Sequence, residues 1–305
     1  MLFNEIAKYE QQETDYKILK MPNQPRLLAD SINWTGHRLT SFLITIPTYL
    51  LAQLRTHRLL KGADDTDLSV NANSDRAIPI DVKIRNVEKF PFIPIPTLTK
   101  SGMSGIEDMT LEQADHIQFF YEQLALKACL NAESLKSLGA SKQTVNRILF
   151  PYSWSDVVVT GDEIAWNSFF GLRTPIDVEP NFRFIARLMS DIYYYTQPKY
   201  LEPGEWHISF SEESENETSI LNKLYISGSC CARLSFAIDR SESIEKHTER
   251  FYKCVDSNHI SIAEHQARVP EKSINLDHRF NSNVRGWMLL RKIIEDYNGI
   301  FTNLK

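Results

Sequence analysis

The sequence predicts an α+β fold. Strand-like and helix-like segments alternate irregularly along the 305 residues, and neither a G-x-G-x-x-G fingerprint nor a repeat of solenoid period is present. These observations argue against a doubly wound parallel sheet, in which strands and helices alternate regularly. With 42% hydrophobic and 24% charged residues, the composition is that of a soluble globular protein. The length allows two domains or one large domain.

Charge and composition disfavour several classes of function. The formal net charge is −5, whereas proteins that coat nucleic acids carry basic faces, so we expect no nucleic-acid partner. Residues 1–10 have no signal-peptide pattern, and the longest apolar run, residues 42–54, is too short for a bilayer and contains Pro47. The four cysteines have no zinc-ligand spacing. We therefore expect a reduced cytoplasmic protein with no metal and no membrane partner.

The N-terminal part is predicted to hold an arm, a strand and a helix. Residues 1–35 are polar and proline-containing, and we assign them to an N-terminal arm. Residues 39–46 are β-prone and predict a strand. Pro47 suits the first position of a helix because its missing amide costs nothing there, and we expect that helix to stop at Gly62. An acidic turn over residues 62–67 follows.

One long helix is predicted near the middle of the chain. Thr110 and Gln113 have the spacing of a capping box, and the helix that follows is expected over residues 111–138. Its aromatic residues 119–121 are expected to face the core. Before this helix, beyond Pro79, residues 90–96 are expected to be extended and proline-spaced.

Shorter elements follow the long helix. A helix is predicted over residues 141–149 and a strand over residues 156–160. Thr160 and Glu163 have capping-box spacing for a helix with aromatic residues. Pro180 stands near the start of the next helix.

The C-terminal third is predicted to begin with a flexible acidic loop over residues 211–222. Two strand-like runs follow, residues 223–227 and 232–238. Helices are predicted over residues 243–255 and 284–297 from the spacing of their apolar side chains.

Two clusters of polar and basic residues flank the acidic turn. Residues 53–58 (Gln-Leu-Arg-Thr-His-Arg) close the predicted helix, and residues 69–79 carry serine, asparagine and arginine. Arginine supplies a planar fork of donors suited to phosphate, and short polar side chains add hydrogen bonds. Cations in the last helical turn also complement the helix dipole. Taken alone, these clusters are either a solvated helix end or an anion site.

Together these clusters resemble the signature of the flavin-dependent thymidylate synthases, Gln-x-x-Arg-His-Arg followed by Asn-x-x-Ser-x-Arg. The first motif is similar to Gln53, His57 and Arg58, and the second to Asn71, Ser74 and Arg76. Two further arginines also resemble family positions, namely Arg173, which follows Leu172 after an aromatic helix, and Arg147, which lies before a proline.

The order of the remaining blocks resembles a circular permutation. Residues 231–236 and 259–265 are similar to family segments that normally lie near the N-terminus, but here they lie near the C-terminus, as in the phage-encoded branch. The resemblance implies a single large domain with a mixed or antiparallel sheet flanked by long helices. In that domain residues 36–210 would form the core and residues 223–305 the permuted segment that completes it.

The resemblance also implies an activity. It implies FAD-dependent transfer of a one-carbon unit from methylenetetrahydrofolate to C5 of a pyrimidine deoxynucleotide, with dUMP to dTMP as the leading reaction and NADPH as reductant. The enzyme would be a homotetramer with sites between subunits, in the cytoplasm or in a host cytoplasm if viral. The long helix and residues 193–195 are candidate interface material.

The site residues follow from the same resemblance. Arg173 would be catalytic, because a guanidinium can stabilise negative charge on the base carbonyls. The substrate would be bound by Gln53, Ser74, Arg76, Arg147 and Arg173. The flavin would be contacted by His57, Arg58, Asn71, Ser261 and Glu264.

Departures from the family pattern keep two alternatives open. Thr56 stands where the family has an arginine, and residues are inserted between Arg58 and Ser69, which motivates a hydroxymethylase acting on dUMP or dCMP for viral DNA modification. Asp162 and Ile164 stand where the family has residues that touch flavin, which motivates a non-catalytic nucleotide-binding homologue.

Overall fold

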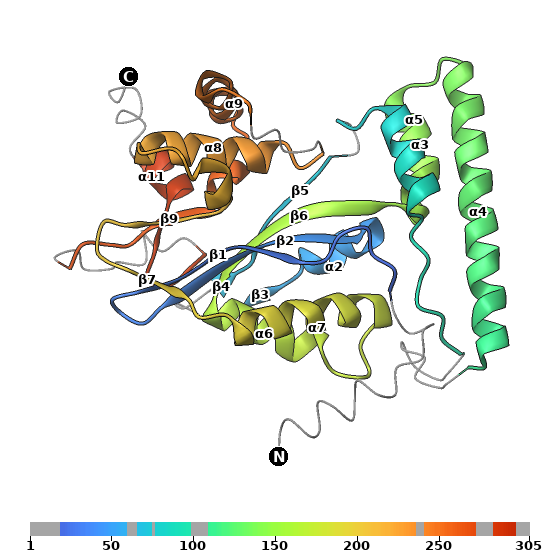
Figure 1. Ribbon diagram of the computed structural model, residues 1–305, viewed down its shortest axis with the longest axis horizontal. Helices are drawn as coiled ribbons and strands as arrows, with labels where there is room; N and C mark the ends of the chain where they lie inside the picture. Colours follow the sequence, from blue (N-terminus) through green and yellow to red (C-terminus); the bar gives the residue numbers. More distant parts are fainter. Residues whose placement is uncertain are drawn as a thin grey trace.

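A mixed five-stranded sheet forms the centre of the molecule, with helices on both of its faces (Figure 1). The computed structural model describes residues 19–59, 66–74, 77–98, 109–235, 241–272 and 283–296. The strand order is β5-β6-β2-β1-β7, and only the β1–β7 pair is parallel. The strands are β1 (Arg26–Asn33), β2 (Arg38–Pro47), β5 (Ser69–Ala72), β6 (Trp154–Asp162) and β7 (Lys199–Leu201).

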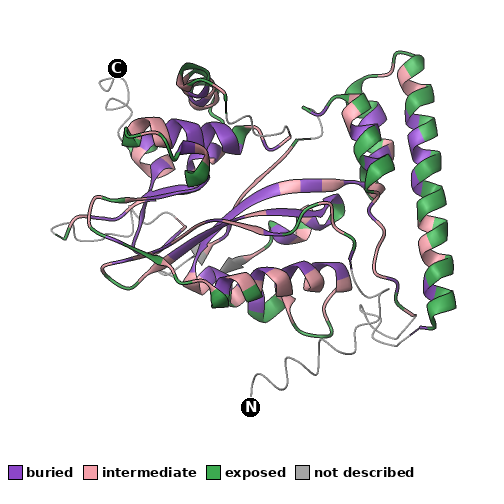
Figure 2. Ribbon diagram, viewed as in Figure 1, coloured by how far each residue is buried: buried purple, intermediate pink, exposed green. Residues whose placement is uncertain are grey.

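Side chains of β2 and β6 alternate between two cores, because successive residues of a strand point to opposite faces. Val157 and Val159 face a core that includes Trp166, which lies under α6 (Glu163–Arg173) and α7 (Pro180–Tyr195). Val158 faces a second core under α8 (Ile220–Ala232), α9 (Ile244–Asp256) and α11 (Leu290–Asp296). Figure 2 shows the strands buried between these two helical layers. We call them the α6–α7 face and the α8–α9 face.

A small antiparallel sheet joins the C-terminal segment to the main sheet. It has the order β10-β9-β8, with β8 (Trp206–Ile208), β9 (Gln266–Arg268) and β10 (Met288–Leu289). The buried Trp287 packs in one cluster with Leu39 of β2. Asn33 Nδ2 donates to the Gly286 carbonyl at 2.7 Å. Strands β3 (Arg58–Leu59) and β4 (Thr66–Asp67) pair with each other in a two-stranded sheet of their own.

Three helices form a separate cluster at one side of the molecule. They are α3 (Ile80–Lys89), α4 (Leu111–Ser137) and α5 (Lys142–Leu149). Ile84, Cys129 and Val145, one from each helix, belong to one buried cluster. Figure 1 shows α4 standing at the outer edge, with α3 and α5 between it and the sheet.

The α+β class, the mixed sheet and the flanking helices are confirmed. The capping box of Thr110 and Gln113 is present at the start of α4, and Pro180 occupies the first turn of α7. Helices α5 and α9 and strands β2 and β6 also lie where the sequence predicts them. No helix among the described residues is long and apolar enough to cross a membrane.

Several predictions for the first half of the chain were wrong. Residues 26–33, assigned to the arm, form the inner strand β1, and residues 80–89, for which no helix was predicted, form α3. The proline-spaced residues 90–96 form no helix or strand, as predicted. Pro47 ends β2, and the helix expected after it is a 3-10 turn (Thr48–Leu50) followed by α2 (Leu51–Leu54). The expected stop at Gly62 lies outside the described residues.

Other corrections concern capping, strands and exposure. Asp162, not Thr160, caps α6. The run 223–227 is helical and lies inside α8, which also takes in the start of the run 232–238; residues 236–238 lie outside the described residues. The expected helix 284–297 begins only after β10. Phe119 and Phe120, expected in the core, are 54% and 63% exposed.

Candidate functional site

Four of the predicted site residues that the structure describes form two pairs, which lie on opposite faces of the main sheet. His57 packs against Phe169 and Phe182, which belong to the core of the α6–α7 face. Asn71 bonds to the Cys231 carbonyl, and Cys231 belongs to the core of the α8–α9 face. One chain therefore does not bring all of its predicted site residues into one pocket.

The first pair is His57 and Arg173. Arg173 lies in the last turn of α6, and its Nε donates to His57 Nε2 at 2.8 Å. The guanidinium carbon lies 4.9 Å from the centre of the Phe182 ring. Because an arginine nitrogen can only donate, His57 Nε2 must accept, so the imidazole is neutral. Burial, and then the charge of Arg173, lowers the pKa of His57 to about 4.

Gln53 and Thr56 stand next to this pair. Gln53 lies in α2, and its backbone carbonyl accepts a hydrogen bond from Thr56 Oγ1 at 2.7 Å. Thr56 therefore closes the end of α2 with its hydroxyl. The pair is held where α2 ends against the aromatic face of α6 and α7.

The second pair is Asn71 of β5 and Ser261. Ser261 Oγ donates to Asn71 Oδ1 at 3.4 Å, and Asn71 Nδ2 donates to the Cys231 carbonyl at 2.8 Å. Close by, the Ser74 amide donates to Ser235 Oγ at 3.2 Å. Strand β5 thus contacts both C-terminal blocks, residues 231–236 and 259–265.

Glu264 extends this group. It lies three residues after Ser261 and forms an ion pair with Arg291 of α11. Burial raises the pKa of Glu264, and the hydrogen bond and charge of Arg291 oppose that shift. A half-buried carboxylate is therefore held in place beside the Asn71–Ser261 pair.

The structure tests only one of the three remaining predicted arginines. The side chain of Arg58 and the whole of Arg76 lie outside the described residues. Arg147 is exposed on α5, and within the described residues it forms no hydrogen bond or ion pair with either pair. Its contribution to a site in the same chain stays a prediction.

Asp162 has a structural role in the described chain. Its Oδ1 accepts from the amides of Ile164 and Ala165 at 3.1 and 2.9 Å, and its Oδ2 accepts from the Arg285 amide at 2.9 Å. Both carboxylate oxygens are therefore used to cap α6 and to hold the C-terminal segment.

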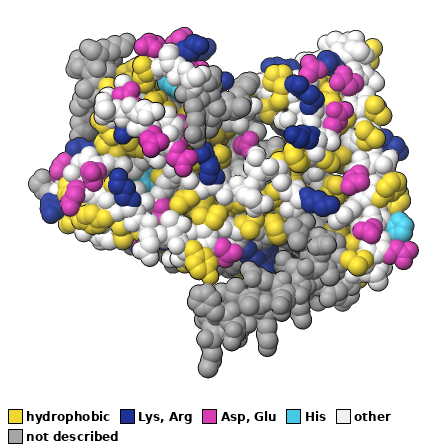
Figure 3. Space-filling model, viewed as in Figure 1, with side chains coloured by type: hydrophobic (Ala, Val, Ile, Leu, Met, Phe, Trp, Pro, Cys, Tyr) yellow, Lys and Arg dark blue, Asp and Glu magenta, His cyan; other side chains and the backbone are white. Residues whose placement is uncertain are grey.

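A cavity of about 430 Å³ adjoins the Asn71–Ser261 pair on the α8–α9 face. We call it the α3 cavity, because α3 forms one wall, while β2, β6 and residues 73 and 234–235 form the others. Asn73, two residues after Asn71, lines it. Figure 3 shows a notch in the surface between the part that carries α8 and α9 and the α3–α5 cluster.

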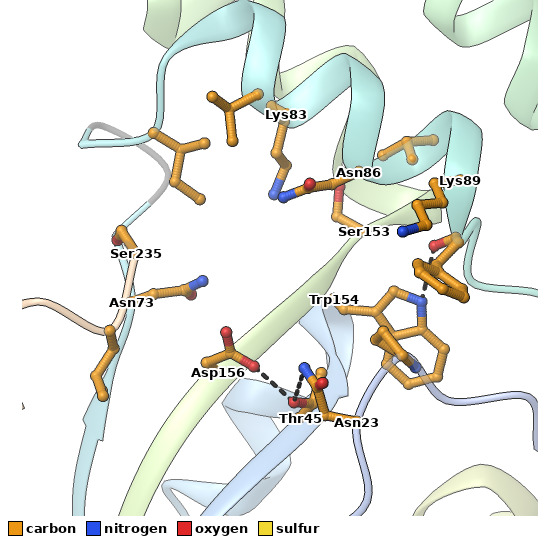
Figure 4. Close-up of a pocket in the computed structure, with 16 residues that line it drawn as sticks. Asn23, Thr45, Asn73, Lys83, Asn86, Lys89, Ser153, Trp154, Asp156 and Ser235 are labelled. Carbon is orange, nitrogen blue, oxygen red and sulfur yellow. Dashed lines mark hydrogen bonds between the residues drawn. The ribbon is translucent and has the colours of Figure 1, made fainter. Parts of the chain in front are cut away.

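Sequence reasoning missed the charged residues of the α3 cavity. Lys83 is only 2% exposed, and Asp156 lines the floor on β6. Thr45 Oγ1 donates to Asp156 Oδ1 at 2.6 Å (Figure 4), and burial raises the pKa of Asp156 despite this hydrogen bond. A lysine at a core-facing position of an amphipathic segment was the signal that could have found this wall. No helix was predicted over residues 80–89, so this signal was missed.

The described residues contain no group of three or more histidine, cysteine, aspartate or glutamate side chains arranged to hold a metal ion.

Comparison with known proteins gives a weak likeness. No family model matches the sequence, and no curated protein matches it. A crystal structure of a UMP/dUMP methylase, PolB from Streptomyces cacaoi, bound with 5-Br UMP aligns with a TM-score of 0.43 at 14% identity, over 56% of this chain and 87% of that one. The same methylase bound with 5-Br dUMP aligns with a TM-score of 0.38 at 14% identity, over 51% and 65%. At these values the likeness does not place the chain in a family.

Proposed function

We propose that this protein transfers a one-carbon unit from methylenetetrahydrofolate to C5 of a pyrimidine deoxynucleotide, in a flavin-dependent reaction with NADPH as reductant. The resemblance of the motifs makes dUMP to dTMP the leading reaction. The observation that carries the proposal is the contact of Ser261 with Asn71 across 190 positions of the chain. It joins the two sequence blocks that the permuted family pattern assigns to one flavin site.

The residues present suit a flavin in their chemistry. The amide of Asn71, the hydroxyl of Ser261 and the carboxylate of Glu264 are neighbours on the α8–α9 face and offer both donors and acceptors. These residues would hold FAD. When bound, the flavin supplies the hydride that reduces the transferred carbon.

Arg173 and His57 would act on the nucleotide. Arg173 presents its guanidinium at the end of α6, where it can stabilise negative charge on a base carbonyl. His57 accepts from Arg173 Nε and so fixes the orientation of that guanidinium. His57 is thus a positioning residue, and its neutral state leaves the positive charge on the arginine alone.

A complete site would need more than one copy of the chain. The two pairs lie on opposite faces of one sheet, so residues from a second copy would have to complete each site. We propose the homotetramer that the resemblance implies, with the exposed side of α4 as interface material.

The second candidate is a hydroxymethylase that acts on dUMP or dCMP. This candidate uses the same site residues and differs only in the product. It is favoured by Thr56, whose hydroxyl lies at the end of α2 where the resembled signature has an arginine.

Product mass tests the proposal and separates the two candidates. Purified protein, FAD, NADPH and methylenetetrahydrofolate are incubated anaerobically with dUMP or dCMP, and the mass of the nucleotide is then measured by mass spectrometry. A gain of one methyl supports thymidylate-type methylation, and a gain of one hydroxymethyl supports the second candidate. Unchanged nucleotides with flavin bound would overturn both.

A further inference from the structure

One short turn of the chain carries two of the proposed flavin contacts. Ser261 lies in the 3-10 turn Ile260–Ala263, and Glu264 follows it directly. The Glu264 amide donates to the Ser261 carbonyl at 3.2 Å, and the Ser261 hydroxyl donates to Asn71 of β5. The backbone of this turn therefore fixes where the Glu264 side chain begins. The charge and orientation of its carboxylate depend on what packs against the turn.

Helix α11 packs against this turn. Leu290 and Ile294, four residues apart, are buried in one cluster with Ile262 of the turn. The same cluster includes residues of α8, and Figure 1 shows α11 beside that helix. The apolar side of α11 thus anchors the helix, and the next residue, Arg291, reaches the Glu264 carboxylate.

Arg291 is shared between two carboxylates that differ in exposure. Its Nη1 donates to Glu264 Oε1, and its Nε donates to Glu295 Oε1 at 2.9 Å. The pair with Glu295 has i,i+4 spacing, which holds the guanidinium along the helix. The Glu264 side chain is only 16% exposed, against 37% for Glu295. Water can solvate Glu295, whereas Glu264 depends on Arg291 for its charge to be stable.

Arg291 also opposes protonation of Glu264. Burial raises the pKa of Glu264, and the hydrogen bond and charge of Arg291 lower it. Glu295 raises it further, and among the described residues of α8, α9 and β5, which pack against the same turn, no charged group adds to these effects. An ionised carboxylate only accepts hydrogen bonds, whereas a protonated one also presents a donor. Glu264 Oε2 accepts no hydrogen bond from the described residues.

We propose that Arg291 is a positioning residue of the flavin site, which keeps the Glu264 carboxylate ionised and oriented so that Oε2 accepts a hydrogen bond from a sugar hydroxyl of FAD. Carboxylates hold ribose hydroxyls in this way in other dinucleotide sites. FAD carries such hydroxyls on its ribityl chain and on its ribose. This inference rests on the proposed function and adds a residue of α11 to the same site.

The pH dependence of FAD binding tests this role. The full-length protein is titrated with FAD from about pH 5.5 to 8.5, and quenching of flavin fluorescence gives the affinity. Affinity should fall as the pH drops through the folded pKa of Glu264, because protonation removes an acceptor. In Arg291→Met that pKa rises, so the fall should begin about one pH unit or more higher. Arg291→Lys keeps the charge and should stay close to the wild type.

Two variants separate the charge of Arg291 from its packing. Lys292→Met is the matched control, because Lys292 forms the same kind of i,i+4 pair with Asp296, at 2.7 Å, one residue further along α11. It should leave the pH profile unchanged. Glu264→Gln removes the titrating group, so the addition of Arg291→Met to that variant should not move the profile further.

Glu295→Gln carries the test in the opposite direction, and it does so even if Arg291→Met does not fold. It removes the exposed carboxylate whose charge raises the pKa of Glu264. The fall in FAD affinity should therefore move to lower pH. Urea unfolding of each variant shows whether it is folded, and a shift to higher pH in folded Glu295→Gln overturns the inference.

Failure of the inference is distinct from failure of the proposed function. If Arg291→Met binds FAD with the pH profile of the wild type, Arg291 has no positioning role, and the proposed function stands. An equal shift in Lys292→Met, or in Arg291→Met added to Glu264→Gln, assigns the effect to the helix and overturns the inference in the same way. A wild-type protein that binds no FAD at any pH overturns the proposed function itself, and the inference with it.

Discussion

The buried His207 and His265 and the partly buried His57 are neutral because of the residues around them. His207 Nδ1 and Nε2 bond to Ser31 and Ser41 at 3.0 and 2.9 Å, and the Ser41 and Thr160 hydroxyls continue this line at 2.6 Å. Thr160 Oγ1 then bonds to His265 Nδ1 at 2.9 Å. Burial lowers the pKa of His207 and of His265 to about 3, and that of His57 to about 4.

These histidines predict a loss of stability in mild acid. Each has a pKa near 6.5 when unfolded, so below pH 6.5 the unfolded chain binds protons that the folded chain does not. We expect each to remove about 1.4 kcal/mol per pH unit as the pH falls from 6.5 toward its folded pKa. His37 has the opposite effect on stability, because its hydrogen bond with Glu163 raises its pKa. The three histidines with lowered pKa outweigh this single contribution. Urea unfolding at pH 7.5, 6.5 and 5.5 measures the slope, and a free energy of unfolding that does not fall below pH 6.5 contradicts it.

Removal of the acceptor on His57 should lower turnover through Arg173. His57→Phe keeps the ring against Phe169 but leaves Arg173 Nε without its acceptor, whereas His57→Gln retains an acceptor. A hydrogen bond to a charged group contributes roughly 1.5–3 kcal/mol, so kcat should fall about tenfold or more in the first variant and less in the second. Arg85→Ala, on the exposed side of α3, is the control. Equal losses in both His57 variants would assign His57 to packing alone.

At the scale of elements, α8 and α9 pack at a glycine. A Cβ built on Gly228 of α8 would lie 2.6 Å from the Phe251 ring of α9, whereas a Cβ on Gly171 of α6 meets nothing within 4 Å. The two helical glycines therefore form a matched pair. The first permits a close contact between helices, and the second only costs conformational entropy.

Gly228→Ala should destabilise the protein by about 1–3 kcal/mol, because the methyl group forces Phe251 or the helix to move. Gly171→Ala should be neutral or stabilise by up to about 1 kcal/mol, from helix propensity alone. Urea unfolding measures both, and a neutral Gly228→Ala would show that α9 is not seated as described.

The sequence correctly predicts helices whose first residues carry a capping box or a proline. The Thr110 capping box and Pro180 mark α4 and α7, and both helices lie where they are expected. Helix α8 was missed because its residues 224–231 are all buried, so the 3.6-residue period that distinguishes a helix from a strand is absent. Helix α3 was missed because Pro79 precedes it and the extended, proline-spaced residues 90–96 follow it, so no helix was predicted between them. Asp162 was compared with a flavin contact, although its position fits a helix cap.

At the scale of the whole molecule, the sequence predicted the spatial arrangement of the motifs only in part. The resemblance assigned Asn71 and Ser261 to one flavin site, and these two side chains are in contact within the chain. It could not predict that His57 and Asn71 lie on opposite faces, since that depends on the sheet order. Nor could it find the α3 cavity, whose walls are distant in the chain and whose Lys83 belongs to no motif.

The outer side of α4 predicts self-association. Phe119, Leu126 and Leu130 are 54%, 49% and 61% exposed and lie seven and four residues apart, the spacing of one helical stripe. Figure 2 shows this helix exposed along most of its length. We expect the purified chain to be a tetramer by light scattering, and the double variant Leu126→Lys, Leu130→Lys to lower its mass. Lys142→Glu on α5 is the control, and a monomeric wild-type chain would contradict the oligomer.

The central claim is flavin-dependent chemistry at a site that β5 and the permuted C-terminal segment form together, and an absorbance spectrum tests it most directly. The purified protein, mixed with FAD and freed of excess, should retain close to one flavin per chain. After anaerobic reduction by NADPH, that flavin should be reoxidised only when nucleotide and methylenetetrahydrofolate are both added. A protein that retains no flavin after added FAD would contradict the account, and the fold would then serve as a nucleotide-binding scaffold.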